Sequence, residues 1–335
     1  MRALRPFQPL RTPSGFAVLT LVALAFLWVI IPSGAIVRLT DSGLGCPDWP
    51  TCQGTITSVT TGHAAIEYTN RILSGIVGVV AVLTCVIGWW APGAPRAVRG
   101  LSLAVALSAA AQIPLGAITV ASGLHPMAVG SHFLLSIVAL TAAVLLALAA
   151  RDWRDGRERR WEPRRGVLAG GVAAAALVVL VTGVVVTAAG PHSGDDDVLR
   201  RWGNLAEAAR VHVRAAMVFT ALAVVLVAWI VREGGVDRLT ARLKWIALPL
   251  VAIQIGIGEY QYRNGLPWQA VVLHVTVAAL VWAVIAAAAY GVARPAGAAY
   301  RRREADREQD TQRTASGSAL RRPSEISSPQ STQIP

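Results

Sequence analysis

The chain has 335 residues, of which 54% are hydrophobic and only 15% are charged, and its formal net charge is +12. Soluble globular proteins carry about 25% charged residues, so this composition excludes a soluble domain and indicates an integral membrane protein. The positive charge does not indicate a nucleic-acid partner, because in so apolar a chain it is explained by arginine-rich cytoplasmic segments next to a lipid bilayer.

Eight apolar segments are long enough to cross a bilayer, which takes about 20 residues as a helix. We therefore predict an all-α integral membrane protein with spans near residues 16–37, 68–90, 98–120, 128–150, 166–188, 206–231, 243–260 and 269–291. Arginines precede the first span and no small-residue cleavage site follows it. We expect this span to remain as a membrane helix instead of being removed as a signal peptide.

Basic residues gather on one side of the predicted membrane. They lie in residues 1–15, in the connections 91–99, 151–165 and 232–244, and after the last span. The positive-inside rule places this side, with both termini, in the cytoplasm, and makes the protein a multi-pass protein of the cell membrane. Residues 292–335 are polar and charged, with few bulky apolar residues, and predict a disordered cytoplasmic tail.

The connection after the first span contains two of the three cysteines, Cys46 and Cys52. In the predicted topology this connection faces outward, where disulfides form, and five intervening residues can close a small ring. We predict a disulfide, with two free thiols as the alternative. The chain contains no CxxC or CxxCH motif, which excludes covalent c-type haem attachment. Cys85 lies inside a span and is expected to be an inert core residue.

The residues from His63 to Arg71 stand where this polar connection ends and the second span begins. In a helix, His63, Glu67 and Asn70 share one face. A carboxylate at the edge of an apolar span is costly unless it has a function, which suggests a site. The alternative is an ordinary helix start, in which Glu67 pairs with Arg71 at i,i+4. This stretch alone favours neither interpretation.

An internal repeat relates the two halves of the chain. The segment ending at His132 aligns without gaps with the one ending at His274, at an offset of 142 residues and with eight identities over 21 positions. The identical residues of the first copy are Gln112, Ile113, Gly116, Gly123, Leu124, Ala128, Val129 and His132. We predict two pseudo-symmetric four-helix bundles, residues 16–150 and 166–291, joined by a basic cytoplasmic linker at 151–165. Because each copy has an even number of spans, we expect an axis along the membrane normal.

Histidines near the outward ends of the spans are the residues with metal-binding chemistry. His212 and His274 lie at similar depth in the second half. Two imidazoles that face each other in a four-helix bundle can hold a haem as axial ligands. We predict a bis-histidine haem site here. The alternatives are hydrogen-bonded core histidines and a proton-relay pair.

The first half offers a different set of ligands. His132 is the repeat partner of His274, but the partner of His212 is Asn70, and a neutral amide is a poor iron ligand. His63 lies on the face of Asn70, yet roughly 10 Å away along the helix axis at about 1.5 Å per residue. The first half therefore has one strong axial ligand.

Glu67 is the second difference between the halves, because Ala209 stands at the equivalent position. The repeat thus predicts a closed bis-histidine haem for electron transfer in one half and an open site with a carboxylate in the other. A carboxylate in such a place suits proton transfer or the stabilisation of a cationic intermediate.

Over residues 16–291 the sequence resembles the haem A synthase family. The most specific match is the run Arg-Leu-Thr-x-Ser-Gly-Leu-x-Cys-Pro-Asp-Trp-Pro, which spans residues 38–50. Further matches are Glu67 with Arg71, the segment from Gly116 to His132, and the pair His212 and His274.

The resemblance implies a membrane oxidoreductase that oxidises a methyl group of haem O to the formyl group of haem A, through successive hydroxylations with water as the oxygen source, for cytochrome c oxidase biogenesis. It implies haem b on His212 and His274, the iron of the substrate haem O on His132, and Glu67 as the catalytic carboxylate. It also implies a disulfide between the two outward cysteines. The implied partners are haem O synthase, which is a prenyltransferase, and the cytochrome c oxidase assembly machinery.

The chain departs from the family at Asn70, where the family has a second histidine for the substrate haem. Three readings follow: the iron is five-coordinate, Asn70 holds a water, or His63 serves after a shift in the helix. Arg71 and Arg38 are candidates to bind haem propionates, or are interfacial side chains that reach toward water.

Two other functions compete with the enzyme. One is a b-type electron-transfer protein with two haems, and the other is a haem transporter or oxidase assembly factor without chemistry. Glu67 and the unequal axial ligands favour the enzyme.

Overall fold

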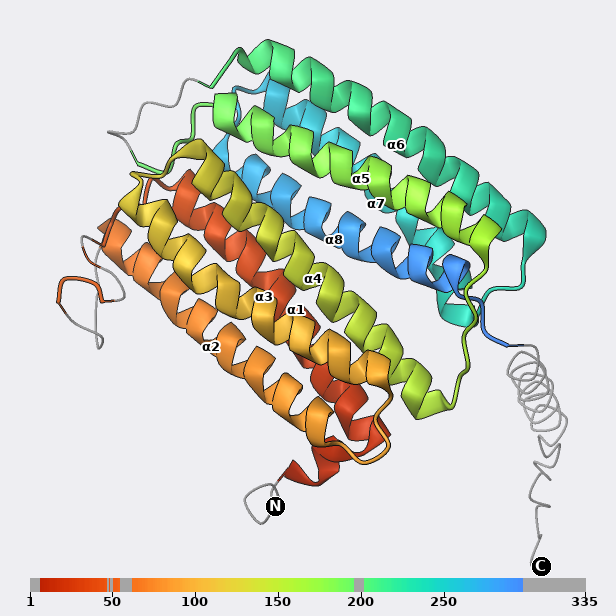
Figure 1. Ribbon diagram of the computed structural model, residues 1–335. Helices are drawn as coiled ribbons and strands as arrows, with labels where there is room; N and C mark the ends of the chain where they lie inside the picture. Colours follow the sequence, from red (N-terminus) through yellow and green to blue (C-terminus); the bar gives the residue numbers. More distant parts are fainter. Residues whose placement is uncertain (1–6, 47, 49–50, 55–61, 196–201, 298–335) are drawn as a thin grey trace, which may run out of the picture.

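The computed structural model of the protein describes residues 7–46, 48, 51–54, 62–195 and 202–297. Eight long helices and one short 3-10 helix, η2 (Pro9–Arg11), form in these residues (Figure 1). The long helices are α1 (Pro13–Leu39), α2 (Gly62–Trp90), α3 (Arg96–Ala121), α4 (Pro126–Asp155), α5 (Pro163–Ala189), α6 (Leu205–Glu233), α7 (Arg238–Arg263) and α8 (Trp268–Ala293).

All eight long helices are sufficiently apolar and long to cross a membrane. Each predicted span lies inside one of them, so the all-α multi-pass fold is confirmed. Several predictions lie outside the described residues. These are the tail beyond residue 297, residues 1–6, and the residues of the 38–50 run at 47, 49 and 50.

Helix ends follow local chemistry. Asn204 caps α6 by accepting from the N–H groups of the first turn, and Asp237 caps α7 in the same way, as short polar side chains do at N-caps. The imidazole of His125 caps α4, and Gly156 ends that helix with a φ of 61°, in the left-handed region that glycine favours.

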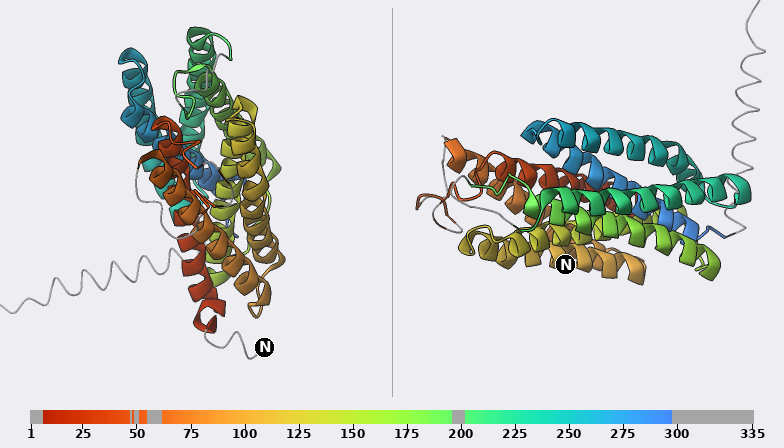
Figure 2. Two further views of the ribbon diagram at one scale, coloured as in Figure 1. Left: turned by 90° about the vertical axis from the view of Figure 1, so that its left-hand side faces the viewer. Right: turned by 90° about the horizontal axis from the view of Figure 1, so that it is seen from above.

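The helices divide into two groups by their contacts. In one group α1 packs on α2 and α4, and α3 packs on α2 and α4; in the other, α5 packs on α6 and α8, and α7 packs on α8. Figure 1 shows the groups side by side, and Figure 2 shows the same long helices from two other directions. The groups meet where α8 contacts α1 and α4 and where α4 contacts α5.

The apolar core follows this arrangement. One buried cluster lies within the first group and includes Phe16, Val98 and Leu146. A second cluster crosses between the groups, since it contains Leu140 of α4 and Ile285 of α8. The two groups therefore share apolar surface and do not stand apart.

The two ends of the helices differ in chemistry. One end, called here the cysteine end, carries the connection with Cys46 and Cys52 and the α3–α4, α5–α6 and α7–α8 connections. The other, called the arginine end, carries residues 151–162 and the α6–α7 connection. The α3–α4 and α7–α8 turns have the same conformation, with positive φ at Gly123 and Leu124 (59° and 58°) and, in the other copy, at 265 and 266 (74° and 60°).

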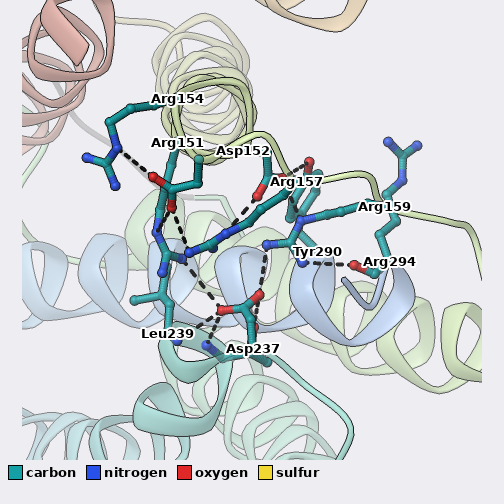
Figure 3. A network of polar contacts seen from close by, with 11 residues as sticks. Arg151, Asp152, Arg154, Arg157, Arg159, Asp237, Leu239, Tyr290 and Arg294 are labelled. Atoms are coloured by element: carbon teal, nitrogen blue, oxygen red, sulfur yellow. Dashed lines mark hydrogen bonds and ion pairs between the residues drawn. The ribbon is translucent and has the colours of Figure 1, made fainter. Parts of the chain in front are cut away.

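A buried ion-pair network joins the two groups at the arginine end (Figure 3). Arg159 lies between two carboxylates, with its Nε 2.5 Å from Asp152 Oδ2 and its Nη2 2.7 Å from Asp237 Oδ2. The hydroxyl of Tyr290 donates to Asp152 at 3.0 Å. Burial raises the pKa of Asp237, but the ion pair with Arg159 and the cap hydrogen bonds outweigh it and lower that pKa below its ordinary value. The linker, predicted only to be basic, thus holds α4, α7 and α8 together.

Candidate functional site

Two histidines of the second group face each other at the cysteine end. His212 lies in α6 and His274 in α8, and their ring centroids are 6.5 Å apart. Two metal–nitrogen bonds of about 2 Å, with roughly 1 Å from each nitrogen to its ring centre, place opposed imidazoles about 6 Å apart across one iron. The observed spacing therefore fits one iron between the two rings.

Thr182 determines which nitrogen of His212 is left for a metal. The Thr182 hydroxyl donates to carbonyl oxygens of its own helix at 2.9 and 3.0 Å. The same oxygen lies 3.1 Å from His212 Nδ1. Because its hydrogen is used on the backbone, the hydroxyl accepts the Nδ1–H of the imidazole. The lone pair of His212 then lies on Nε2, ready for a metal.

Glycines leave room for both rings. A Cβ atom at Gly183 would lie 3.2 Å from His212 Cε1, and one at Gly258 would lie 3.1 Å from His274 Cε1. Among the described residues, the Nδ1 atom of His274 is buried without a hydrogen-bond partner. The other ring nitrogen of His274, Nε2, lies 3.1 Å from the amide nitrogen of Gln254. Buried polar atoms of proteins are normally paired, so Nδ1 is the ring nitrogen of His274 that is open to a further group. These residues fit a haem.

His132 in α4 shares several neighbours with His274, although the Gln254 amide also contacts Nε2 of the His274 ring, whereas the Gln112 amide contacts the Ser136 hydroxyl. A Cβ atom at Gly116 would lie 3.5 Å from His132 Cε1. The amide nitrogen of Gln112 lies 3.3 Å from the His132 carbonyl oxygen, as that of Gln254 lies 3.1 Å from the His274 carbonyl oxygen. His132 Nδ1 is also buried and without a partner in the described part of the chain. These contacts support the predicted repeat, whose symmetry axis stays a prediction.

Asn70 in α2 is the repeat partner of His212, and a hydroxyl contacts each of them. Ser33 of α1 donates to Asn70 Oδ1 at 2.9 Å, where Thr182 of α5 contacts the imidazole of His212. Ser33 and Thr182 each directly precede a glycine that begins a similar segment, Gly-Ala-Ile-Val at 34–37 in α1 and Gly-Val-Val-Val at 183–186 in α5. The equivalence of Asn70 and His212 therefore extends to the residues that hold them.

Glu67 is buried near the start of α2, with 4% of its surface exposed. Its Oε2 accepts the backbone N–H of Cys46 at 2.7 Å, and its Oε1 pairs with Arg71 Nη2 at 2.6 Å. The ion pair expected of an ordinary helix start is thus present. The same carboxylate is also buried and accepts a hydrogen bond from Cys46, outside its own helix. A carboxylate has about four lone-pair positions, so these two bonds leave Glu67 able to accept a proton.

Arg71 fastens the cysteine loop, which comprises the described residues from Cys46 to Cys52. Its Nη1 donates to the carbonyl oxygens of Asp48 and Thr51 at 2.8 and 2.5 Å, and Cys46 and Cys52 form the predicted disulfide. Hydrogen bonds from the Thr51 hydroxyl and from two backbone N–H groups lower the pKa of Asp48. Arg71 thus uses its Nη1 group to hold the cysteine loop. Its role at a haem propionate stays a prediction.

The remaining candidates lie at the edge of the cysteine end. His63 is exposed, and its Nδ1 lies 3.0 Å from Ser42 Oγ, so its ring contacts the residues that follow α1 and not the neighbourhood of Asn70. Arg38 lies beside the α5–α6 connection, since a Cβ atom at Gly194 would be 3.3 Å from Arg38 Cγ. The backbone N–H of Gly43 donates to the carbonyl oxygen of Gly194 at 2.7 Å, so Arg38 lies where the two halves meet.

Ser33 and Thr182 were missed as site residues in the sequence. The signal for them was present, because the α1 and α5 segments match and put the two hydroxyls at equivalent positions. Gln112 and Gln254 were recognised as part of the repeat without a role. The structure places them at the backbone of the two α4 and α8 histidines.

Comparison with known proteins decides the family. Residues 17–286 match the model of the COX15-CtaA family, which is described as a cytochrome oxidase assembly protein. The chain belongs to this family. The resemblance expected from the sequence is thereby confirmed.

Proteins named haem A synthase are similar to part of the chain. The haem A synthase of Alkalihalophilus pseudofirmus is 33% identical over 138 residues, that of Geobacillus thermodenitrificans 31% over 140 residues, and that of Bacillus licheniformis 30% over 135 residues. The matches cover 41%, 41% and 40% of this chain and 46%, 43% and 44% of the relatives. The similarity thus covers less than half of this chain and less than half the length of each of these relatives.

Proposed function

We propose that this protein is a haem A synthase, an oxidoreductase that converts the methyl group of haem O to the formyl group of haem A through successive hydroxylations. One methyl group and one water give one formyl group, four protons and four electrons, so the oxygen comes from water. The unequal residues of the two halves carry the proposal. A bis-histidine pair lies in the second half, whereas the first half has His132 with an amide and a buried carboxylate.

Haem b is the proposed resident cofactor, held by His212 and His274. A bis-histidine haem supplies one-electron transfer when it is bound. The protein contributes the orientation of the ligands: Thr182 holds the His212 tautomer that leaves Nε2 free, and the glycines at 183 and 258 keep space beside both rings. The spacing of the rings supports this assignment.

Haem O is the proposed substrate, with its iron on His132. The orphaned Nδ1 of the His132 imidazole and the glycine beside its ring are the features that His132 shares with His274. The substrate would lie in the first half, in which α2 provides both Asn70 and Glu67. Arg38 and Arg71 remain the candidates for its propionates.

Glu67 is the proposed catalytic carboxylate. The oxidation releases protons from the methyl carbon and from water, and a general base near the reacting carbon accepts them. The carboxylate also favours positive charge that develops when electrons are removed. The ion pair with Arg71 and the hydrogen bond from Cys46 hold it in place under the cysteine loop, which covers it from water.

The setting of the reaction follows from the charges of the connections. We place the arginine end and both termini in the cytoplasm of the cell membrane, because basic connections stay on that side. The cysteine end, with both haem sites, then faces outward. Haem O synthase as the supplier of the substrate, and the assembly of cytochrome c oxidase as its destination, are proposed partners.

The test is a haem extraction from cells that make haem O and express the protein or a variant. Glu67→Gln keeps the size of the side chain but removes its charge. We expect a loss of hydroxylated and formyl products of at least about 100-fold, the usual contribution of a general base. The matched control is Glu259→Gln, which breaks another i,i+4 pair with arginine, but at a side chain that is 55% exposed.

Full conversion by the Glu67→Gln variant would remove that residue from the chemistry. No product from wild-type protein that contains both haems would contradict the enzyme, and would favour electron transfer or haem transport.

A further inference from the structure

We infer that the haem of the first half has an open iron position on the Asn70 side, where a small external ligand binds and accepts a hydrogen bond from Asn70 Nδ2. This inference rests on the proposed binding of haem by His132. It adds a ligand site to the first half and predicts that the second half has none.

The hydroxyls at the two equivalent positions work in opposite directions. The Thr182 hydroxyl donates its hydrogen to backbone carbonyl oxygens of its own helix and therefore accepts a hydrogen bond from the His212 ring. Ser33 instead donates its hydrogen to Asn70 Oδ1 at 2.9 Å. The first arrangement leaves a lone pair on the far side of the imidazole, while the second occupies the only side-chain acceptor of the amide with a hydroxyl.

The amide nitrogen Nδ2 is the polar side-chain atom of Asn70 that can still contact a ligand. Its two hydrogens have no partner among the described residues. The two ends of a planar amide point in different directions, so Nδ2 faces away from Ser33. An amide NH₂ group has donors but no lone pair for a metal. It therefore cannot ligate the iron as His212 does, but it can stabilise a ligand that the iron holds.

The length of the asparagine side chain also indicates an open iron position. An asparagine side chain ends closer to its helix than the Nε2 atom of a histidine does, so exchanging His212 for its partner Asn70 leaves space between helix α2 and the iron. That space admits a diatomic molecule or a similarly small ligand. Cyanide and carbon monoxide both offer an atom that accepts a hydrogen bond.

His63 and Gln112, the nearest candidates to fill the position, both have other partners. The His63 ring contacts Ser42, seven residues or about 10 Å along the helix from Asn70. The amide nitrogen of Gln112 is engaged by the His132 carbonyl oxygen and by the Ser136 hydroxyl. The open position is thus a property of Asn70 itself.

The experiment measures ligand binding to the purified full-length protein containing both haems. Cyanide is added to the ferric form and carbon monoxide to the ferrous form, and optical and electron paramagnetic resonance spectra are recorded. We expect about half of the haem to bind each ligand, because the bis-histidine half is closed. His132→Ala should remove the responsive half and leave the low-spin half.

Two variants at Asn70 separate the open position from the hydrogen bond. Asn70→His supplies the missing imidazole and should abolish the response, so that all haem is low-spin. Asn70→Leu keeps the position open but removes the donor, and should weaken cyanide binding about tenfold, the usual effect of one such hydrogen bond. Thr220→Val in α6, where the Thr220 hydroxyl donates to the backbone of its own helix, is the control in the second half and should leave the responsive fraction unchanged.

Wild-type protein that holds two haems and binds neither ligand would overturn the inference, while the extraction assay could still show haem A formation. Unchanged cyanide affinity in Asn70→Leu would overturn the hydrogen bond. Protein that binds one unresponsive haem, even with excess haem supplied, would overturn both the inference and the proposed substrate site.

Discussion

The two halves of the molecule have the same supports around one histidine and different chemistry at the other position. His132 and His274 each have a glycine beside the ring and a glutamine amide at the backbone carbonyl. The difference lies in α2 and α6, where Asn70 replaces His212 and Glu67 replaces Ala209. One helix of each pair thus keeps the common histidine, and the other carries the residues that differ between the halves.

The connections at the cysteine end differ along with these helices. In the first half Glu67 and Arg71 fasten a disulfide-closed loop over the start of α2. In the second half His192 contacts the carbonyl oxygen of Leu266 at 2.8 Å, and the equivalent of the carboxylate is an alanine. The half that contains Glu67 is therefore also the half in which a disulfide-closed loop is held over the start of the helix.

The halves differ at the arginine end too, and this difference gives the largest predicted effect on stability. Asp237 caps α7 and pairs with Arg159, whereas Pro95 at the repeat-equivalent start of α3 has no side-chain cap. Asp237→Ala would leave Arg159 with one carboxylate fewer. Breaking a buried pair costs roughly 3 kcal/mol, and thermal unfolding in detergent should show this loss at pH 7.

The pH dependence of this effect has a definite sign. Because the folded-state pKa of Asp237 is lowered from 3.8, its stabilisation is complete above that value and is lost as the pH falls through the folded pKa. The difference between wild type and Asp237→Ala should therefore shrink below about pH 3.8. Glu207→Gln, at a side chain that is 71% exposed, is the control and should change stability little. A difference that stays constant in acid would contradict the assigned ion pair.

A smaller effect is expected where the halves are most alike. In Gly258→Ala the new Cβ atom would lie 3.1 Å from His274 Cε1, whereas in Gly116→Ala it would lie 3.5 Å from His132 Cε1, an ordinary contact. Mild overpacking costs about 1 kcal/mol, so Gly258→Ala should weaken haem binding about fivefold in a haem titration. Gly116→Ala should leave the affinity of the first half unchanged. Equal effects of the two substitutions would contradict the difference in space beside the His274 and His132 rings.

The eight helices were predictable because long apolar runs in a bilayer satisfy their backbone groups only as helices. The disulfide was predictable from two cysteines in one short connection between the first two spans. The pairing of Asp152 and Asp237 through Arg159 was not, because these residues come from distant connections and meet only after α4, α7 and α8 have packed.

The candidate site was predictable as far as the repeat reached. It paired His132 with His274 and Asn70 with His212, but could not show the role of Ser33 or Thr182. Hydroxyls in membrane helices often bond to their own backbone, as those of Thr220 and Thr276 do here. The packing of the helices decides which hydroxyl faces a site, and this packing cannot be read from the sequence.

The sequence alone favours neither a helix-start ion pair nor a catalytic carboxylate at Glu67. The structure contains the ion pair with Arg71 and adds the bond to Cys46. The two interpretations are therefore compatible, since the ion pair positions the carboxylate.

The most direct measurement compares His132→Ala with His274→Ala, recording in each variant the low-spin haem spectrum and the conversion of haem O. We predict that His132→Ala keeps the low-spin spectrum of the second half and forms no haem A. His274→Ala should lose that spectrum. A His132→Ala protein that still forms haem A, or one that loses the low-spin haem while His274→Ala keeps it, would contradict the assignment of the two halves.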